Sequence, residues 1–176
     1  FTAEYALGRR EDALETARRL ADARSGDADT LRIAGDLLLR EGDPARAAVA
    51  FEVAQEQIDL DPALLGRLGT TRIAAGDLDG AREVFEALAG LLPRDPRAPY
   101  FLATIALRHG DEDEARRWVD ESLRRDPRFT TGLVALGGWL RADGREAEAI
   151  RMFEDALERD PTDEDARRGL NGGDAR

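Results

Sequence analysis

Several residue types are missing or rare in this chain of 176 residues, and each absence excludes a class of function. There is no cysteine, which excludes disulfides, zinc–cysteine sites and thiol catalysis. No uninterrupted apolar run approaches the roughly 20 residues of a bilayer-spanning helix, so we expect no direct membrane insertion. Lysine is absent as well, and all 26 basic residues are arginine against 37 acidic ones. The resulting net charge of -11 argues against nucleic acid as a partner.

Side chains that serve in common catalytic and metal sites are also scarce. The single histidine, His109, precedes Gly110 at the end of a predicted helix, where a cation suits the helix dipole. The two serines, Ser25 and Ser122, have no histidine near them in the repeat pattern described below, so no Ser-His-Asp triad is expected. The acidic run at 111–114 lacks the spacing of a calcium loop and suits a helix N-terminus. No phosphate-binding loop or His-Glu-x-x-His motif occurs, so the sequence predicts no catalytic residue, no metal and no cofactor.

What the chain does contain is a period of 34 residues. Glycine occupies only 17 positions, yet it recurs at this spacing five times: Gly8, Gly42, Gly76, Gly110 and Gly144. An alanine follows five residues after each glycine, at Ala13, Ala47, Ala81, Ala115 and Ala149. Four residues further on stand Ala17, Phe51, Phe85, Val119 and Phe153. Self-similarity at a fixed period of this length is the signature of a repeat architecture.

Each period reads as two amphipathic helices joined by a turn. Glycine accepts the positive φ that follows a helix end, and Pro44 suits a first helical position. Good N-caps follow three of the glycines, at Asp43, Asp77 and Asp111. Prolines that stop the second helix recur at Pro93, Pro127 and Pro161. In the unit 28–61 the proline comes late, at Pro62, so we expect its second helix to be about one turn longer and its loop shorter.

The pattern resembles the tetratricopeptide repeat (TPR) family, in a form typical of bacterial proteins. The first half of one unit carries it in Leu31, Ala34, Gly35 and Leu38, and a later unit in Leu133, Leu136 and Gly137. Two residues depart from the family pattern: Arg72 stands where a Tyr-like core residue is usual, and Pro99 at a bulky first-helix position. The resemblance implies an all-α fold, an α-solenoid in which antiparallel helix pairs form a right-handed superhelix.

The period divides the chain into one continuous solenoid, 1–176. The intervals are a partial repeat at 1–27, full repeats at 28–61, 62–95, 96–129 and 130–163, and a partial helix with a tail at 164–176. Phe1 falls in the middle of a first helix, so we expect a fragment or a processed chain. The compartment is left open, with cytoplasmic favoured over periplasmic.

The resemblance also implies that the first helix of each unit lines a concave groove. The residues expected to form this peptide-binding groove are Arg32, Asp36, Leu39, Arg67, Thr70, Ile73, Arg97, Tyr100, Phe101, Thr104, Leu107, Arg108, Val134, Gly138 and Arg141. Two first helices, predicted at 62–75 and 96–109, each carry two arginines and no acid, whereas second helices are acidic. Arginine pairs bidentately with carboxylates, so we expect a protein or peptide partner that is partly acidic and partly apolar. The alternative is that these arginines are solvated or pair with neighbouring acids.

These features predict a non-catalytic protein-interaction scaffold. Two alternatives stay open. One is self-assembly through repeats that stack end to end as a homo-oligomer, because a solenoid without capping helices has apolar ends. The other is a regulatory or structural domain of a larger enzyme or envelope-assembly complex. A clamp for a C-terminal carboxylate, which some TPR domains build from lysines and asparagines, is not possible here, since the one asparagine is Asn171 in the tail.

Overall fold

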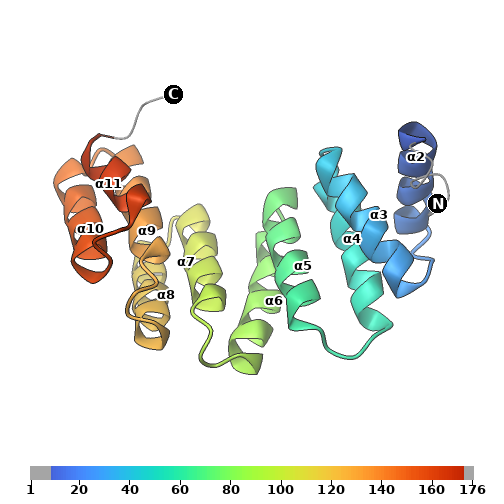
Figure 1. Cartoon of the computed structure of the whole chain (residues 1–176), viewed down its shortest axis with the longest axis horizontal. Helices are drawn as coiled ribbons and strands as arrows, with labels where there is room; N and C mark the ends of the chain where they lie inside the picture. Colours follow the sequence, from blue (N-terminus) through green and yellow to red (C-terminus); the bar gives the residue numbers. More distant parts are fainter. Residues whose placement is uncertain (1–8, 173–176) are drawn as a thin grey trace. The chain divides into compact units, whose positions relative to one another are not determined.

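The computed structural model describes residues 9–172, and within them it contains helices and no strand (Figure 1). The helices are α2 (Arg10–Asp22), α3 (Ala28–Arg40), α4 (Pro44–Glu56), α5 (Pro62–Ala75), α6 (Leu78–Leu91), α7 (Arg97–His109), α8 (Glu112–Arg125), α9 (Thr131–Ala142), α10 (Glu146–Arg159) and α11 (Glu164–Leu170). The predicted all-α helical-repeat solenoid is confirmed. The expected start of the chain in mid-helix, at Phe1, lies outside the described residues.

Contacts divide the chain into two compact units, an N-terminal unit (Phe1–Leu88) and a C-terminal unit (Ala89–Arg176). In the N-terminal unit α2 packs on α3 and α4, and α4 packs on both α3 and α5. In the C-terminal unit α9 packs on α7, α8, α10 and α11, while α7 also packs on α8. Within each unit, consecutive helices run antiparallel (Figure 1).

Local sequence sets where most helices begin and end. The turn glycines adopt the left-handed conformation, with φ of 76° at Gly42, 81° at Gly76, 77° at Gly110 and 79° at Gly144. Such a φ is strained for a residue with a Cβ, which explains the repeated glycine. The aspartate after three of these glycines accepts a hydrogen bond from a backbone N–H three residues on. The bonds are 3.2 Å from Arg46 to Asp43, 3.0 Å from Gly80 to Asp77 and 2.8 Å from Glu114 to Asp111.

The expected extra turn of α4 is wrong. This helix ends at Glu56, one position earlier in the repeat than the ends of α6, α8 and α10. The late proline, Pro62, does not terminate α4, because it is the first residue of α5 and its missing N–H needs no partner there. The loop of residues 57–61 instead closes with Asp61, whose carboxylate accepts a 2.9 Å hydrogen bond from the Ala63 N–H.

The core of each repeat joins its two helices through a phenylalanine that packs on a glycine. Phe51, Phe85 and Phe153 are at most 2% exposed. A Cβ built on the facing glycine would lie within 2.5 Å of the ring at Gly35, 2.7 Å at Gly69 and 2.9 Å at Gly137. These distances are too short for a real contact, so the ring occupies space that only glycine leaves open. In the repeat 96–129 the equivalent residues are Ala103 and Val119, both buried in one cluster.

Polar side chains join neighbouring repeats within each unit. Arg72, which departs from the family pattern, has a side chain only 16% exposed. It donates a 2.5 Å hydrogen bond to Glu52 on α4 and a 3.0 Å bond to the Gly80 carbonyl. In the C-terminal unit Arg125 donates to the carbonyls of Ala89, Leu92 and Asp95, and so satisfies acceptors at the end of α6.

Across the described helices, none combines the length and the apolar composition that crossing a membrane would require.

Candidate functional site

In the N-terminal unit the predicted groove residues bring two arginines and one acid together. Arg32 and Asp36 lie on α3, and Arg67 comes from α5. Arg67 forms an ion pair with Asp36, and its guanidinium carbon lies 4.6 Å from the centre of the Phe51 ring. Arg32 has a weaker contact, 4.0 Å from Asp29. These two residues, Arg32 and Arg67, are called the arginine patch: their charges repel each other, and each also contacts an acid, Asp29 or Asp36.

One residue of the arginine patch, Arg67, lies partly buried next to a like charge. The pKa of Arg67 is lowered from its ordinary value, first because the guanidinium is partly buried and then because Arg32 repels it. Arginine stays protonated at neutral pH, so the lowered pKa reflects an unfavourable environment for the charge. A carboxylate from a ligand would relieve both causes, since it replaces lost hydration with a charge-assisted hydrogen bond.

The other predicted groove residues of this unit differ in exposure. Thr70 is exposed, but its hydroxyl donates to carbonyls of its own helix, Gly66 at 3.1 Å and Arg67 at 2.9 Å. Leu39 is half-buried. Ile73 is only 8% exposed and belongs to the core, so it offers little surface to a ligand.

In the C-terminal unit the predicted residues of α7 form an aromatic cluster. The rings of Tyr100 and Phe101 lie 4.9 Å apart, and both side chains are half-buried. A third ring, Phe129 from the α8–α9 loop, meets Tyr100 edge-on at 5.9 Å. The Thr104 hydroxyl donates to the Tyr100 carbonyl at 3.0 Å. Leu107 is only 8% exposed, so the apolar surface of α7 lies at its N-terminal half.

Two of the predicted groove arginines of this unit are held by the protein itself. Arg97 forms a bidentate pair with Asp95, with Nε 2.9 Å and Nη2 2.5 Å from the carboxylate oxygens, and the pair lowers the pKa of Asp95. Arg141 donates to Glu146 at 2.9 and 2.6 Å and to the Gly169 carbonyl at 2.7 Å, and lies over the Phe153 ring. The alternative interpretation of the groove arginines, as partners of neighbouring acids, therefore applies to Arg97 and Arg141, as it does to Arg67 with Asp36. Arg108 is exposed at the end of α7.

The remaining predicted residues lie on α9. Val134 is half-buried and packs against the core clusters of this unit. Gly138 is exposed, and a Cβ built on it would meet nothing within 4 Å. This part of the first-helix face is open, and it carries no unpaired charge among the predicted residues.

Phe129 was not predicted as a site residue, although the sequence contains a signal for it. The equivalent position in four other repeats is aspartate, at Asp27, Asp61, Asp95 and Asp163. A half-buried phenylalanine at a position otherwise reserved for a capping acid breaks the period. A comparison of equivalent loop positions in the sequence identifies Phe129, whereas the groove prediction covers only the first helices.

The residues considered for catalysis or metal binding have structural surroundings. Ser122 is fully buried and donates to the Pro96 carbonyl at 2.9 Å. His109 is the last residue of α7 and is exposed. Within residues 9–172, no group of three or more His, Asp or Glu side chains is placed to hold a metal ion.

Stacked helix pairs with a 34-residue period define a helical-repeat protein. Two sequence profiles, both described as tetratricopeptide repeat, match the chain, one over residues 1–62 and 67–128 and the other over 133–166. The chain belongs to the tetratricopeptide repeat family.

Solved structures of TPR proteins share the fold. YrrB, described as a TPR protein with an unusual peptide-binding site, is 19% identical with a TM-score of 0.65, over 97% of this chain and 88% of YrrB. MamA from Desulfovibrio magneticus RS-1 is 22% identical with a TM-score of 0.65, over 93% and 92% of the two chains. TTC0263, a thermophilic TPR protein of Thermus thermophilus, is 21% identical with a TM-score of 0.65, over 98% and 94%. No curated protein sequence matches the chain.

Proposed function

We propose that this protein is a non-catalytic interaction scaffold that binds a peptide or protein segment on the faces of its first helices. Membership of the TPR family supports an interaction role, and YrrB, which shares the fold, is described as having a peptide-binding site. The observation that carries the proposal is the arginine patch. Arg32 and Arg67 place two like charges close together at a half-buried surface, in a protein whose net charge is -11.

The chemistry of the ligand follows from the two units taken separately. In the N-terminal unit a carboxylate would bind between Arg32 and Arg67, because it would offset the burial and the repulsion that lower the Arg67 pKa. In the C-terminal unit the half-buried rings of Tyr100 and Phe101 would contact an apolar side chain. The proposed partner is thus a segment that is partly acidic and partly apolar.

Selection from a phage-displayed library of random peptides tests this proposal. We expect the enriched peptides to contain Asp or Glu, with dissociation constants of about 1–100 μM at low salt. The double variant Arg32→Gln/Arg67→Gln keeps side chains that form hydrogen bonds but removes both charges, so binding of these peptides should fall about tenfold, or 1.4 kcal/mol. Because Arg67 also pairs with Asp36, a thermal melt of the double variant establishes that it is folded.

The matched control is Arg18→Gln/Arg19→Gln, which removes two exposed charges from α2. It changes the net charge of the protein equally, so it should leave the affinity within about twofold. Enriched peptides without acidic residues, or equal loss of binding in the two double variants, would reject the arginine patch as the binding surface.

A further inference from the structure

One loop position of the C-terminal unit carries phenylalanine, whereas the equivalent position of four other repeats carries aspartate. The aspartates at Asp27, Asp61 and Asp163 cap the helices that follow, and Asp95 accepts a 2.9 Å hydrogen bond from the Arg97 N–H. Phe129 occupies the equivalent place before α9. The N-cap of α9 is Thr130, and its side chain makes no capping hydrogen bond. The repeat has therefore given up a stabilising cap here for an aromatic ring.

Leu91 is a second residue of this unit that departs from the repeat pattern. At the end of the second helices, the residue equivalent to Leu91 is polar in three other repeats: Gln57, Arg125 and Arg159. Leu91 is 40% exposed, which is unusual for a large apolar side chain in this protein. An exposed leucine and an aromatic ring thus replace polar residues at two positions of one surface.

Leu91 and Phe129 line the same pocket. A pocket of about 660 Å³ in the C-terminal unit is lined by the residues 91–97 and by Phe129. Its apolar wall includes Leu91, Pro93, Pro96 and the Phe129 ring. This volume is in the range of pockets that hold small ligands, so the pocket has room for a bulky side chain together with its neighbours.

Hydrogen bonds and a ring contact hold the walls of the pocket in place. The Arg125 side chain is only 12% exposed and donates to the carbonyls of Leu92 and Asp95 in the wall. The Phe129 N–H donates to the Asp126 carbonyl at 3.0 Å, and its ring packs edge-on against Tyr100. A pocket fixed in this way loses little conformational entropy when a ligand binds.

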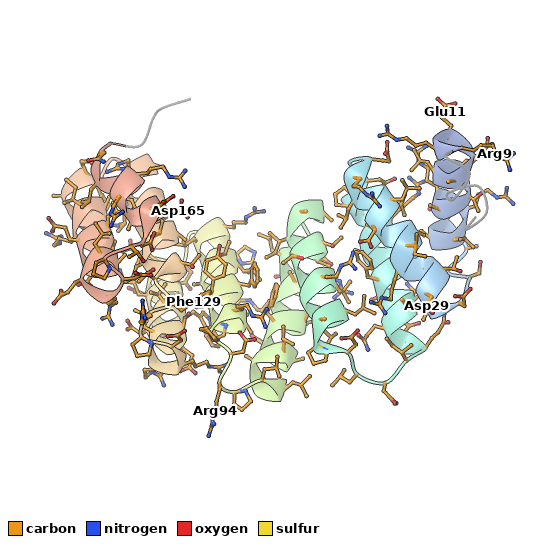
Figure 2. All side chains as sticks on the ribbon, in the orientation of Figure 1. Arg9, Glu11, Asp29, Arg94, Phe129 and Asp165 are labelled. Atoms are coloured by element: carbon orange, nitrogen blue, oxygen red, sulfur yellow. The ribbon has the colours of Figure 1, made fainter. Side chains whose placement is uncertain are left out.

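The rim of the pocket is positive. Asp95 is neutralised by its bidentate pair with Arg97. Arg94 is exposed and has no hydrogen-bond or ion-pair partner among residues 9–172. Figure 2 shows Arg94 projecting from the α6–α7 loop away from the helices. The charge that would complement this rim is a carboxylate on the ligand.

We propose that this loop pocket is a second docking site, which takes a bulky apolar side chain of a partner segment with an acidic residue next to it. The apolar side chain fills the space between Leu91, Pro93 and Phe129, while the neighbouring carboxylate pairs with Arg94. The site goes beyond the first-helix faces, since it is built from the loops between repeats and uses neither Arg32 nor Arg67.

Labelled synthetic peptides test the loop pocket by fluorescence anisotropy. One Gly/Ser peptide carries a central tryptophan flanked by aspartates, a second carries the tryptophan flanked by arginines, and a third carries a central serine flanked by aspartates. We expect the first peptide to bind at least about fivefold more tightly than the other two, because it alone supplies both the ring and the charge.

Variants then place the bound peptide. Phe129→Asp and Arg94→Glu should each weaken binding of the first peptide at least about fivefold, as loss of a central contact does. Phe129→Asp restores the residue found at the equivalent position of four other repeats, so it is not expected to impair folding. Arg117→Glu, on the exposed face of α8, makes the same charge change as Arg94→Glu away from the pocket and should leave binding unchanged.

Three outcomes would overturn the loop pocket. The three peptides could bind equally, the first could fail to bind at about 1 mM, or Phe129→Asp could leave its affinity intact. Binding that is lost in Arg32→Gln/Arg67→Gln but kept in Phe129→Asp would reject the pocket while supporting the first-helix proposal, so the two proposals fail separately.

Discussion

The core of the repeat 96–129 is packed by different residues from those in the other full repeats. In the repeats 28–61, 62–95 and 130–163, a phenylalanine ring lies on a glycine that has no room for a Cβ. In 96–129 the smaller Val119 is paired with Ala103, so the methyl group that the first helix gains fills part of the space that the ring vacates. The period therefore conserves packed volume across the two helices, and not the identity of either residue.

The same repeat also carries the aromatic surface. Tyr100 and Phe101 lie on its first helix and Phe129 in the loop that follows its second. Its core position holds Val119, whereas the equivalent positions of the neighbouring repeats hold Phe85 and Phe153. The substitutions below test this contrast.

The largest effect is expected for Phe85→Ala, because the ring is fully buried against Gly69. We expect a loss of about 3–5 kcal/mol in the free energy of unfolding. Denaturant unfolding followed by circular dichroism measures it, and an unmoved midpoint would show that the ring does not hold the repeat together. Val119→Ala should lose less, since fewer buried atoms are removed.

Gly69→Ala tests the close packing of the Phe85 ring on Gly69 by changing the glycine. The new Cβ would lie 2.7 Å from the Phe85 ring, so we expect a loss of about 1–3 kcal/mol from overpacking. Gly90→Ala is the matched control on the neighbouring helix, because a Cβ there meets nothing within 4 Å. That control should gain about 0.5–1 kcal/mol from helix propensity. Equal effects of the two alanines would refute the packing argument.

Giving the repeat 96–129 the core residues of the other repeats tests whether the packed volume of the core is conserved. Val119→Phe alone should cost about 1–3 kcal/mol, because the larger ring meets the Ala103 methyl group. Adding Ala103→Gly should recover about 0.5–2 kcal/mol of that loss, since the two residues occupy one site. A double-mutant cycle measures the recovery. Strictly additive losses would mean that the two positions do not exchange volume.

The smallest effect is expected for Phe129→Asp. Restoring the capping residue should stabilise the protein by about 0.5–1 kcal/mol, because Asp accepts a backbone hydrogen bond at the start of α9. A thermal melt measures the shift. Destabilisation would contradict the view that Phe129 replaces a stabilising residue.

Helix ends and repeat boundaries were accessible from the sequence because they depend on local chemistry. The turn glycines, the capping aspartates and Pro44 each act on the backbone within a few residues. The helix predicted to be too long, α4, shows the limit of that reasoning: Pro62 was assigned to the end of one helix but begins the next. Proline is compatible with both places, and only the structure distinguishes them.

The site was less accessible because arginine partners are set by tertiary geometry. The groove prediction includes Arg97 and Arg141, and the structure pairs these residues with Asp95, Glu146 and a backbone carbonyl. Arg67 keeps its place in the candidate site because burial and Arg32 disfavour its charge. Spacing within one helix predicts none of these contacts. Arg97–Asp95 and Arg141–Glu146 are local but involve a residue outside the helix of the arginine, whereas Arg141 reaches the Gly169 carbonyl and Arg67 faces Arg32 about one repeat away.

Chemical-shift mapping tests the central proposal most directly. An acidic peptide obtained by selection is titrated into 15N-labelled protein, and the amide signals that move are assigned. The account predicts that the largest shifts lie on the first helices α3 and α5, around Asp36 and Gly66, and that they vanish in Arg32→Gln/Arg67→Gln. Shifts confined to the second helices α4 and α10 would contradict it.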